Sequence, residues 1–230
     1  MQLTIDILRR ESAGATAYTE RFPFETEDSS LTVMTALTIL NRQLAENGKP
    51  PIRFDCSCGQ RKCGACAMRI NARPMLACDA KLLTVQKRGC VLLEPLRKFP
   101  VVAELVVDRS ILFRNLQTLA VWLEHDTVAS GKKAELAYEA SRCLQCGLCL
   151  EVCPNFYPGG TFFGMAGFVP TARLLSELPQ QEQAALRKAY RTHIYEGCGK
   201  SLACRDICPA GIDIGKLLVH SNAAAVWKLP

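Results

Sequence analysis

Residues 143–154 read CLQCGLCLEVCP, and residues 198–209 read CGKSLACRDICP. In the first segment cysteine recurs at steps of three, three and four residues, the second segment has the same spacing of positions, and proline follows the last cysteine in both. The second segment departs from this pattern at one position, where Ser201 stands in place of the counterpart of Cys146. The chain therefore contains one cysteine motif twice, and the second copy lacks one thiol.

This spacing is that of ferredoxins with two iron–sulfur clusters, in which the fourth cysteine of each run binds the cluster of the other run. The first cluster then has four thiolates and is predicted to be 4Fe-4S, with the ligands Cys143, Cys146, Cys149 and Cys208. The second cluster has only three thiolates, which are those of Cys153, Cys198 and Cys204. Because a serine hydroxyl loses its proton far less readily than a thiol, the deficit predicts a 3Fe-4S cluster. A 4Fe-4S cluster with serine or water as its fourth ligand is the alternative.

A third group of cysteines has the plant-type 2Fe-2S spacing, in which four and then two residues separate the first three ligands. The predicted ligands are Cys58, Cys63, Cys66 and Cys78. Gly59 and Gly64 let backbone N–H groups approach the cluster, and the cations Arg61 and Lys62 favour its reduced form. A zinc site is the alternative, although zinc sites prefer two Cys-x2-Cys pairs.

Two of the 13 cysteines remain without a role, Cys56 and Cys90, and we expect both to be small buried apolar side chains. The three histidines, His125, His193 and His220, show no spacing typical of metal ligands. Of these, His220 falls on the last predicted helix, near the second cluster. We therefore expect every metal ligand to be a cysteine.

The N-terminal part of the chain is patterned as strands around one helix, and the remainder as helices. Strands are predicted at residues 1–10, 18–26, 67–70, 74–77 and 91–94, and a helix at residues 32–44. After the connector at residues 95–100, helices are predicted at residues 111–123, 132–141, 172–178, 183–194 and 212–226. The sequence thus predicts an α+β chain, with a mixed domain at residues 1–105 and an all-α domain at residues 106–230.

The composition is that of a folded chain with an unusual number of cysteines. Of 230 residues, 49% are hydrophobic and 22% are charged, which excludes wholesale disorder. No apolar run reaches the roughly 18 residues of a membrane-spanning helix, and Met1–Asp6 lacks the features of a signal peptide, so a cytoplasmic location is expected. In that compartment cysteines serve metal or redox chemistry rather than disulfides. The net charge of +6 is not gathered in a basic stripe with aromatic residues, so no nucleic-acid partner is expected.

No motif for substrate chemistry accompanies the cysteines. The chain has no Gly-x-Gly-x-x-Gly motif and no carboxylate pair in a plausible site. Three one-electron centres without a catalytic group predict a chain that transfers electrons. A zinc-stabilised interaction module is the alternative from a different class of protein, and the three spacings together disfavour it.

Further motifs surround these cysteines. They are CGACAM at residues 63–68, PLRKFPV at residues 95–101 followed by Asp108, CGLC at residues 146–149, and Phe163-Gly164-x-Ala166. With them the chain resembles the iron–sulfur subunits of succinate dehydrogenase and fumarate reductase over nearly its whole length. The resemblance implies a β-grasp 2Fe-2S ferredoxin domain followed by an α-helical ferredoxin domain.

The resemblance also implies partners. These are a flavoprotein that holds FAD and a dicarboxylate, and a membrane anchor that binds quinone, with or without haem. The chain would lie peripherally on the cytoplasmic side of the membrane and carry electrons between FAD and quinone through the 2Fe-2S, 4Fe-4S and 3Fe-4S clusters. The loop at residues 58–66 is expected to face the flavoprotein, and the segments at residues 153–167 and 198–204 to face the anchor. The latter expectation rests on an unusually apolar segment that contains Phe156, Tyr157, Phe162 and Phe163.

Three positions depart from the family pattern. Ser201 replaces an apolar residue, Pro158 replaces a tryptophan of some members, and Asn222 replaces a lysine. The last two family residues lie at the quinone site, so contact between this chain and quinone is not implied. An electron-transfer subunit of a different flavoprotein or of a thiol-linked fumarate reductase is the alternative, although the Cys-Cys-Gly modules of the thiol-linked enzymes do not occur in this sequence.

Overall fold

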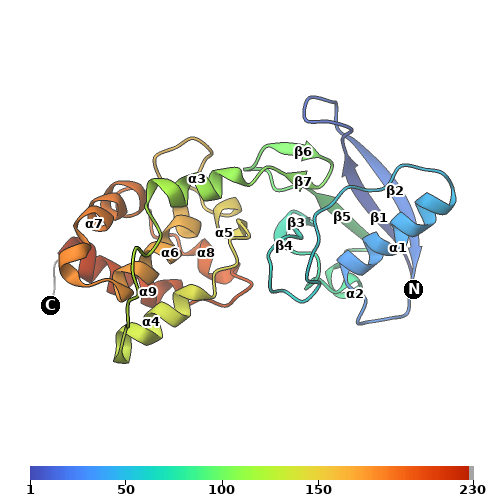
Figure 1. Ribbon diagram of the computed structural model, residues 1–230. Coiled ribbons are helices and arrows are strands. Elements are labelled where there is room, and N and C mark those ends of the chain that lie inside the picture. Colours follow the sequence, from blue (N-terminus) through green and yellow to red (C-terminus); the bar gives the residue numbers. More distant parts are fainter. Residues whose placement is uncertain (228–230) are drawn as a thin grey trace. The chain divides into compact units, whose positions relative to one another are not determined.

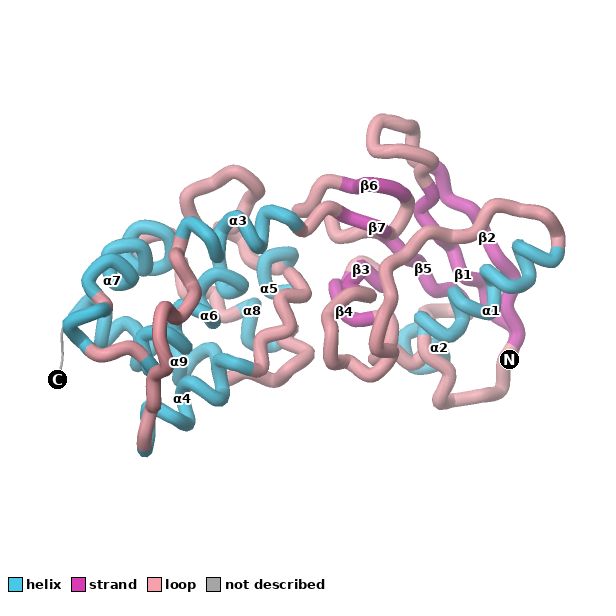
Figure 2. The backbone as a smooth tube through the Cα atoms, in the orientation of Figure 1, coloured by secondary structure: helices cyan, strands magenta, loops and turns pink. Residues whose placement is uncertain are grey.

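The computed structural model describes residues 1–227, and the chain divides between Asp108 and Arg109 into two compact units. Figure 2 shows strands in the first unit, while the second consists of helices and loops. The predicted α+β class, with a mixed unit followed by a helical unit, is confirmed.

The N-terminal unit is built on a five-stranded sheet with the strand order β2-β1-β5-β3-β4 (Figure 1). Its strands are β1 (Gln2–Arg9), β2 (Tyr18–Glu25), β3 (Ala67–Ile70), β4 (Arg73–Leu76) and β5 (Cys90–Glu94). Strand β1 pairs antiparallel with β2 and parallel with β5, which in turn pairs antiparallel with β3. This mixed sheet, with one long helix beside it, is the β-grasp arrangement that the resemblance implied.

Helix α1 (Val33–Glu46) lies against this sheet (Figure 1). It begins after Thr32, whose side-chain oxygen accepts a hydrogen bond from the Thr35 N–H at 3.1 Å, a typical N-cap. Its buried residues recur at helical spacing and are Val33, Ala36, Leu37, Leu40 and Leu44. They share the core with the alternating residues Leu3, Ile5 and Ile7 of β1. A short helix, α2 (Leu82–Val85), precedes β5.

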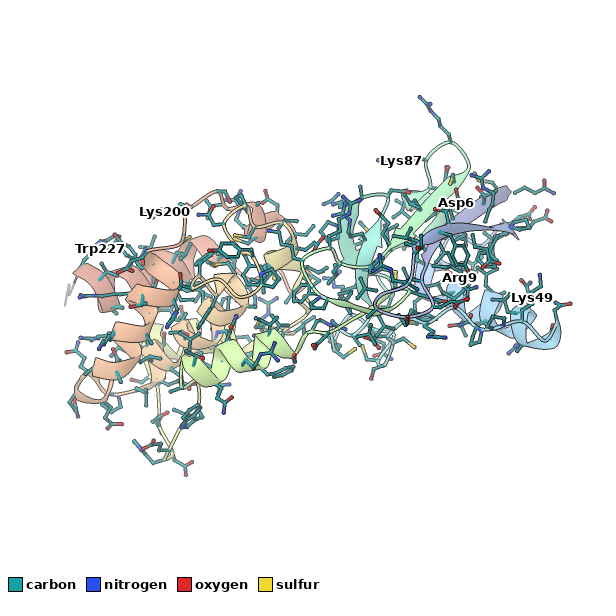
Figure 3. All side chains as sticks on the ribbon, turned by 90° about the horizontal axis from the view of Figure 1, so that it is seen from above. Asp6, Arg9, Lys49, Lys87, Lys200 and Trp227 are labelled. Carbon is teal, nitrogen blue, oxygen red and sulfur yellow. The ribbon has the colours of Figure 1, made fainter. Side chains whose placement is uncertain are left out.

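A two-stranded sheet, β6 (Val101–Ala103) and β7 (Val106–Val107), completes the unit. Glu104, in the turn between these strands, is buried, and its carboxylate accepts hydrogen bonds from Arg9 Nε at 3.0 Å and Nη2 at 2.8 Å. Figure 3 shows Arg9 on strand β1. Because this hairpin is bonded into the first unit, the division between the units follows Asp108 rather than residue 105.

The helical unit is organised around α6, which contacts α3, α4, α5, α7 and α9. Its helices are α3 (Ser110–Thr118), α4 (Gly131–Ser141), α5 (Leu148–Glu151), α6 (Gly164–Glu177), α7 (Ala184–Tyr190), α8 (Ala203–Asp206) and α9 (Ile214–Asn222). Shorter turns are the 3-10 turn η1 (Gln180–Glu182) and the π-helical turns η2 (Arg191–Tyr195) and η3 (Ala223–Trp227). The helices predicted at residues 183–194 and 212–226 therefore each end in a π-helical turn.

Two predicted helices have the wrong bounds. Helix α3 ends at Thr118 and not at Leu123, because Ala120 has a φ of +50°, which a right-handed helix cannot continue. Helix α6 begins at Gly164, before the predicted start at residue 172, and runs through Pro170.

Pro170 is accommodated by a side chain from outside the helix. A proline has no N–H to donate to the carbonyl four residues earlier, which here is that of Ala166. The Ala166 carbonyl instead accepts a hydrogen bond from Nε2 of Gln145 at 3.0 Å. The backbone group that proline leaves without its helical partner is therefore satisfied.

Candidate metal centres

The first group of thiols is brought together by a loop and a hairpin of the N-terminal unit. The loop at residues 56–66 precedes β3, and the β3–β4 hairpin returns the chain so that Cys78 lies beside Cys66. The Cys78 N–H donates to Cys66 Sγ at 3.4 Å, and the Ala77 N–H donates to the Cys66 carbonyl at 3.0 Å. Burial raises the pKa of the Cys66 thiol to about 12, and the neighbouring Cys78 thiol adds to this effect.

Backbone N–H groups of the loop point at sulfur atoms. Those of Gln60 and Lys62 both donate to Cys58 Sγ at 3.3 Å. That of Arg61 donates to Cys78 Sγ at 3.3 Å. The bonds to Cys58, with the one from Gln60 contributing most, lower its pKa to about 7, because hydrogen bonds stabilise a thiolate. The same donors would stabilise a metal-bound thiolate.

Left-handed backbone conformations give the loop its tight curve. Gly59, Arg61 and Gly64 have φ values of +64°, +59° and +74°. At the two glycines this conformation costs little, which is the physical reason for glycine there. The Arg61 guanidinium forms an ion pair with Asp79 at 3.2 Å. Its charge is therefore partly balanced, and the influence of this cation on a cluster is smaller than the sequence alone suggests.

Five cysteines of the helical unit line one cavity: Cys143, Cys146, Cys149, Cys204 and Cys208. Apolar residues of α6 and α9 complete its walls. Burial raises the pKa of Cys149 well above the usual value. The thiols that raise it further are those of Cys146, Cys143, Cys204 and Cys208. The last cysteine of the second run thus lies with the first three cysteines of the first run.

A second group of thiols consists of Cys153, Cys198 and Cys204, of which Cys204 also lines the cavity of the first run. Burial raises the pKa of Cys204 to about 11, and the nearby thiols of Cys153 and Cys198 contribute to the rise. Asn155 Nδ2 donates a hydrogen bond to the Gly197 carbonyl at 2.7 Å, which ties the chain after Cys153 to the residue before Cys198. The last cysteine of the first run therefore lies with the second run.

Ser201 occupies the loop between Cys198 and Cys204 and is exposed. Its neighbours Lys200 and Leu202 have left-handed conformations with φ values of +55° and +57°. Figure 3 shows Lys200 in this loop, at the outside of the helical unit. The second group thus has three thiols, and in the sequence Ser201 stands where the sister run has Cys146.

The donor set fits iron–sulfur clusters better than single ions. Within residues 1–227, no group of three or more His, Cys, Asp or Glu side chains is arranged to hold one metal ion. A cluster is larger than an ion, and its thiolates are distributed over two or more irons, so the relevant property is that the thiols lie together around one space. Cys143, Cys146, Cys149 and Cys208 line one cavity, and Cys153 and Cys198 lie near Cys204. N–H groups are also aimed at the sulfur atoms of Cys58 and Cys78.

The cysteines and histidines without a predicted role differ in their exposure and contacts. Cys56 is exposed, so the expectation that it is buried is wrong, and Cys90 is half-buried in β5. His125 pairs with Glu182 at 3.3 Å, and His193 stacks on Phe163 with 4.2 Å between the ring centroids. Both histidines have structural contacts. His220 lines a different cavity of the helical unit.

The prediction that the aromatic residues after Cys153 form an exposed apolar surface is largely wrong. Phe156, Phe162 and Phe163 are buried within the helical unit, and only Tyr157, with 64% exposure, is on the surface. Asn222, at one of the departures from the family, is buried and accepts a hydrogen bond from the Tyr190 hydroxyl at 2.6 Å. Across residues 1–227, no helix combines the length and hydropathy needed to cross a membrane.

Two polar residues next to the thiols were not found from the sequence. Gln145 Nε2 donates to Cys143 Sγ at 3.2 Å as well as to the Ala166 carbonyl, and Asn155 joins the two cysteine runs. The carbonyl groups that they bind, those of Ala166 and Gly197, lie 21 and 42 residues away in the chain. No local pattern indicates such contacts.

Comparison with known proteins supports both units. A family model described as a 2Fe-2S iron-sulfur cluster binding domain matches residues 4–114, and one described as a 4Fe-4S dicluster domain matches residues 139–212. The succinate dehydrogenase iron-sulfur subunit of Bacillus subtilis is 34% identical over 94% of this chain and 89% of its own length. The fumarate reductase iron-sulfur subunit of Wolinella succinogenes is 29% identical over 95% of each chain.

A solved structure has the same fold. A chain of the Mycobacterium smegmatis Sdh1 complex in the apo form matches with a TM-score of 0.77 and 20% identity, over 99% of this chain and 97% of its own. The predicted order, a 2Fe-2S domain and then a domain with two clusters, is therefore confirmed. The chain belongs to the family of iron–sulfur subunits that transfer electrons in succinate dehydrogenase and fumarate reductase.

Proposed function

We propose that this chain relays single electrons between the FAD of a flavoprotein subunit and a quinone site at a membrane anchor, through three clusters that its cysteines hold. The 2Fe-2S ligands are Cys58, Cys63, Cys66 and Cys78. The 4Fe-4S ligands are Cys143, Cys146, Cys149 and Cys208. The 3Fe-4S ligands are Cys153, Cys198 and Cys204.

The observation that carries this proposal is the exchange of cysteines between the two runs. Cys208 is among the thiols that raise the pKa of Cys149, while Cys153 is among those that raise the pKa of Cys204. Each run thus supplies its last thiol to the other group, which is the arrangement of a protein with two neighbouring clusters.

The residues of the chain have three tasks in this function. Their thiolates hold the irons, and bound iron–sulfur clusters take up and release one electron at a time. N–H groups such as those of Gln60, Lys62 and Arg61 stabilise the sulfur charge. Burial of Cys146 and Cys204 limits contact with water, which influences the reduction potential.

We place the flavoprotein against the loop at residues 58–66 and the anchor, with its quinone and with or without haem, against the second cysteine group. The reason is the order of the clusters along the chain. The exposed residues Tyr157 and Ser201 lie in the segments assigned to the anchor. The expected position is peripheral, on the cytoplasmic side of the membrane.

The test uses the chain purified anaerobically with its native partners. Succinate should reduce the clusters, followed by EPR, and added quinone should reoxidise them. In the variant Cys149→Ala, which loses a 4Fe-4S ligand, flavin reduction should persist while quinone reduction is lost. Quinone reduction at the wild-type rate in this variant would show that electrons do not pass through the chain.

A further inference from the structure

A cavity of about 370 Å³ lies in the helical unit between α4, α6, α7 and α9. Its size is within the range of small-molecule sites. Three leucines among its lining residues, Leu136, Leu175 and Leu217, are buried and give it an apolar floor. None of the 11 predicted cluster ligands lines it, so it is separate from the electron-transfer groups.

The same cavity is lined by four basic residues, Lys132, Lys133, Arg187 and His220. No carboxylate is among the described residues that line it. Nor does any of the four form an ion pair with a residue between 1 and 227. Arg187 is held in place by the bond from its Nε to Gln183 Oε1 at 3.1 Å. The positive charge of Lys132, Lys133 and Arg187 is therefore uncompensated by the part of the chain that the structure describes.

Helix α4 begins at this cavity and increases the positive potential. The N-terminus of a helix carries partial positive charge and favours acidic side chains. The first turn of α4 contains no acidic residue and instead holds Lys132 and Lys133, and the Ser130 side chain makes no capping hydrogen bond. The pKa of His220 is lowered by burial and then by the charges of Lys132 and Lys216. Cations at the start of a helix are unfavourable unless an anion joins them.

We propose that this cavity binds a small phosphate monoester, with the phosphate at the start of α4 between Lys132, Lys133, Arg187 and His220 and the apolar body over the leucine floor. A phosphate group suits this site for two reasons. Arginine and helix N-termini both recognise its oxygen atoms, and its charge of about −2 matches several cations at once.

The test is calorimetric titration of the cluster-containing chain with phenyl phosphate at constant ionic strength. Phenol serves as the neutral analogue and inorganic phosphate as the anion without an apolar body. Phenyl phosphate should bind, inorganic phosphate should bind more weakly and phenol should not bind. Lys132→Gln and Arg187→Gln should each weaken binding of phenyl phosphate roughly tenfold to a hundredfold, as expected for loss of a charge-assisted hydrogen bond.

The matched control is Lys188→Gln, which removes the same charge from the neighbouring position of α7 but from a residue that does not line the cavity. It should leave binding unchanged. Because Lys132 is exposed, its variant should fold even if Arg187→Gln disturbs α7. Absence of phenyl phosphate binding to the wild type overturns the proposal, as does equal weakening in all three variants. Binding to phosphatidic-acid vesicles without binding of phenyl phosphate also overturns it, in favour of a charged surface that meets membranes.

Discussion

The side-chain amide of Gln145 joins the cysteine Cys143 to helix α6. Its Nε2 lies 3.2 Å from Cys143 Sγ and 3.0 Å from the carbonyl oxygen of Ala166, the group that Pro170 leaves without its helical partner. One amide therefore compensates for a proline and donates to a sulfur atom that we assign to the 4Fe-4S cluster. The relationship links the backbone geometry of α6 to the electronic environment of the cluster.

Gln145→Met should lower the reduction potential of the 4Fe-4S cluster. A hydrogen bond to a ligand sulfur favours the more negative, reduced state, and its loss should shift the potential by tens of millivolts, on the order of 1 kcal/mol. Redox titration followed by EPR measures the shift. Pro170→Ala returns an N–H to the Ala166 carbonyl and should cause a smaller shift of the potential in the same direction. An unchanged potential in Gln145→Met would show that the Gln145 hydrogen bond does not influence the cluster.

Ser201→Cys should convert the 3Fe-4S cluster into 4Fe-4S. The new thiol stands at the spacing that Cys146 has in the sister run, so it can bind a fourth iron. A fourth cysteinate lowers the potential, and each fall of about 59 mV changes the equilibrium of a one-electron step tenfold. The oxidised-state EPR signal of the 3Fe-4S cluster should disappear in the variant.

The reverse substitution, Cys146→Ser, provides the control. It should remove one iron from the first cluster and give a second 3Fe-4S signal. If the wild type has no such signal, or if Ser201→Cys retains it, Ser201 is not at the vacant ligand position.

Gly197→Ala should disrupt the second cysteine group. A Cβ at this position would lie 2.5 Å from Phe162 Cβ and 2.6 Å from its Cγ, so either the ring or the backbone before Cys198 must move. Such overpacking costs about 1–3 kcal/mol, and the 3Fe-4S signal should weaken while the 2Fe-2S signal is retained. Gly14→Ala, where no atom lies within 4 Å of the new Cβ, should leave both signals intact.

Arg9→Met should reduce the stability of the fold far more than Arg21→Met. Arg9 and Glu104 form an ion pair at 2.8 Å with side-chain exposures of only 5% and 4%, so removal of Arg9 leaves a buried carboxylate without its partner. We expect a loss of about 3–5 kcal/mol of stability. The Arg21→Met substitution should cost much less stability, because Arg21, which pairs with Asp6 at 2.8 Å, is 67% exposed and water screens its charge. Thermal unfolding of the two variants makes the comparison, and similar midpoints would contradict it.

Much of the fold follows from local pattern. The alternation of Leu3, Ile5 and Ile7 and the helical spacing of Leu37, Leu40 and Leu44 identify β1 and α1, because burial has a period of two in a strand and 3.6 in a helix. The first half of α6 cannot be predicted from local pattern, because Pro170 argues against a helix. The Gln145 side chain that compensates for Pro170 comes from a distant segment.

The cysteine groups could be proposed from the sequence because their ligands occur in short runs. The surroundings of these groups could not be predicted from the sequence. Phe162 and Phe163 look like an exposed apolar patch in the sequence, yet they are buried, because the loop after Cys153 folds back toward Gly197 and His193. The cavity lined by Lys132, Lys133, Arg187 and His220 likewise takes its lining residues from α4, α6, α7 and α9. No single segment of the sequence therefore indicates it.

The central claim is that the chain carries three iron–sulfur clusters, and metal analysis of the anaerobically purified chain with spin-quantified EPR tests it most directly. The account predicts about nine iron atoms per chain, an oxidised 3Fe-4S signal and a 2Fe-2S signal after reduction with dithionite. Stoichiometric zinc in place of iron, with no such EPR signals, would contradict it.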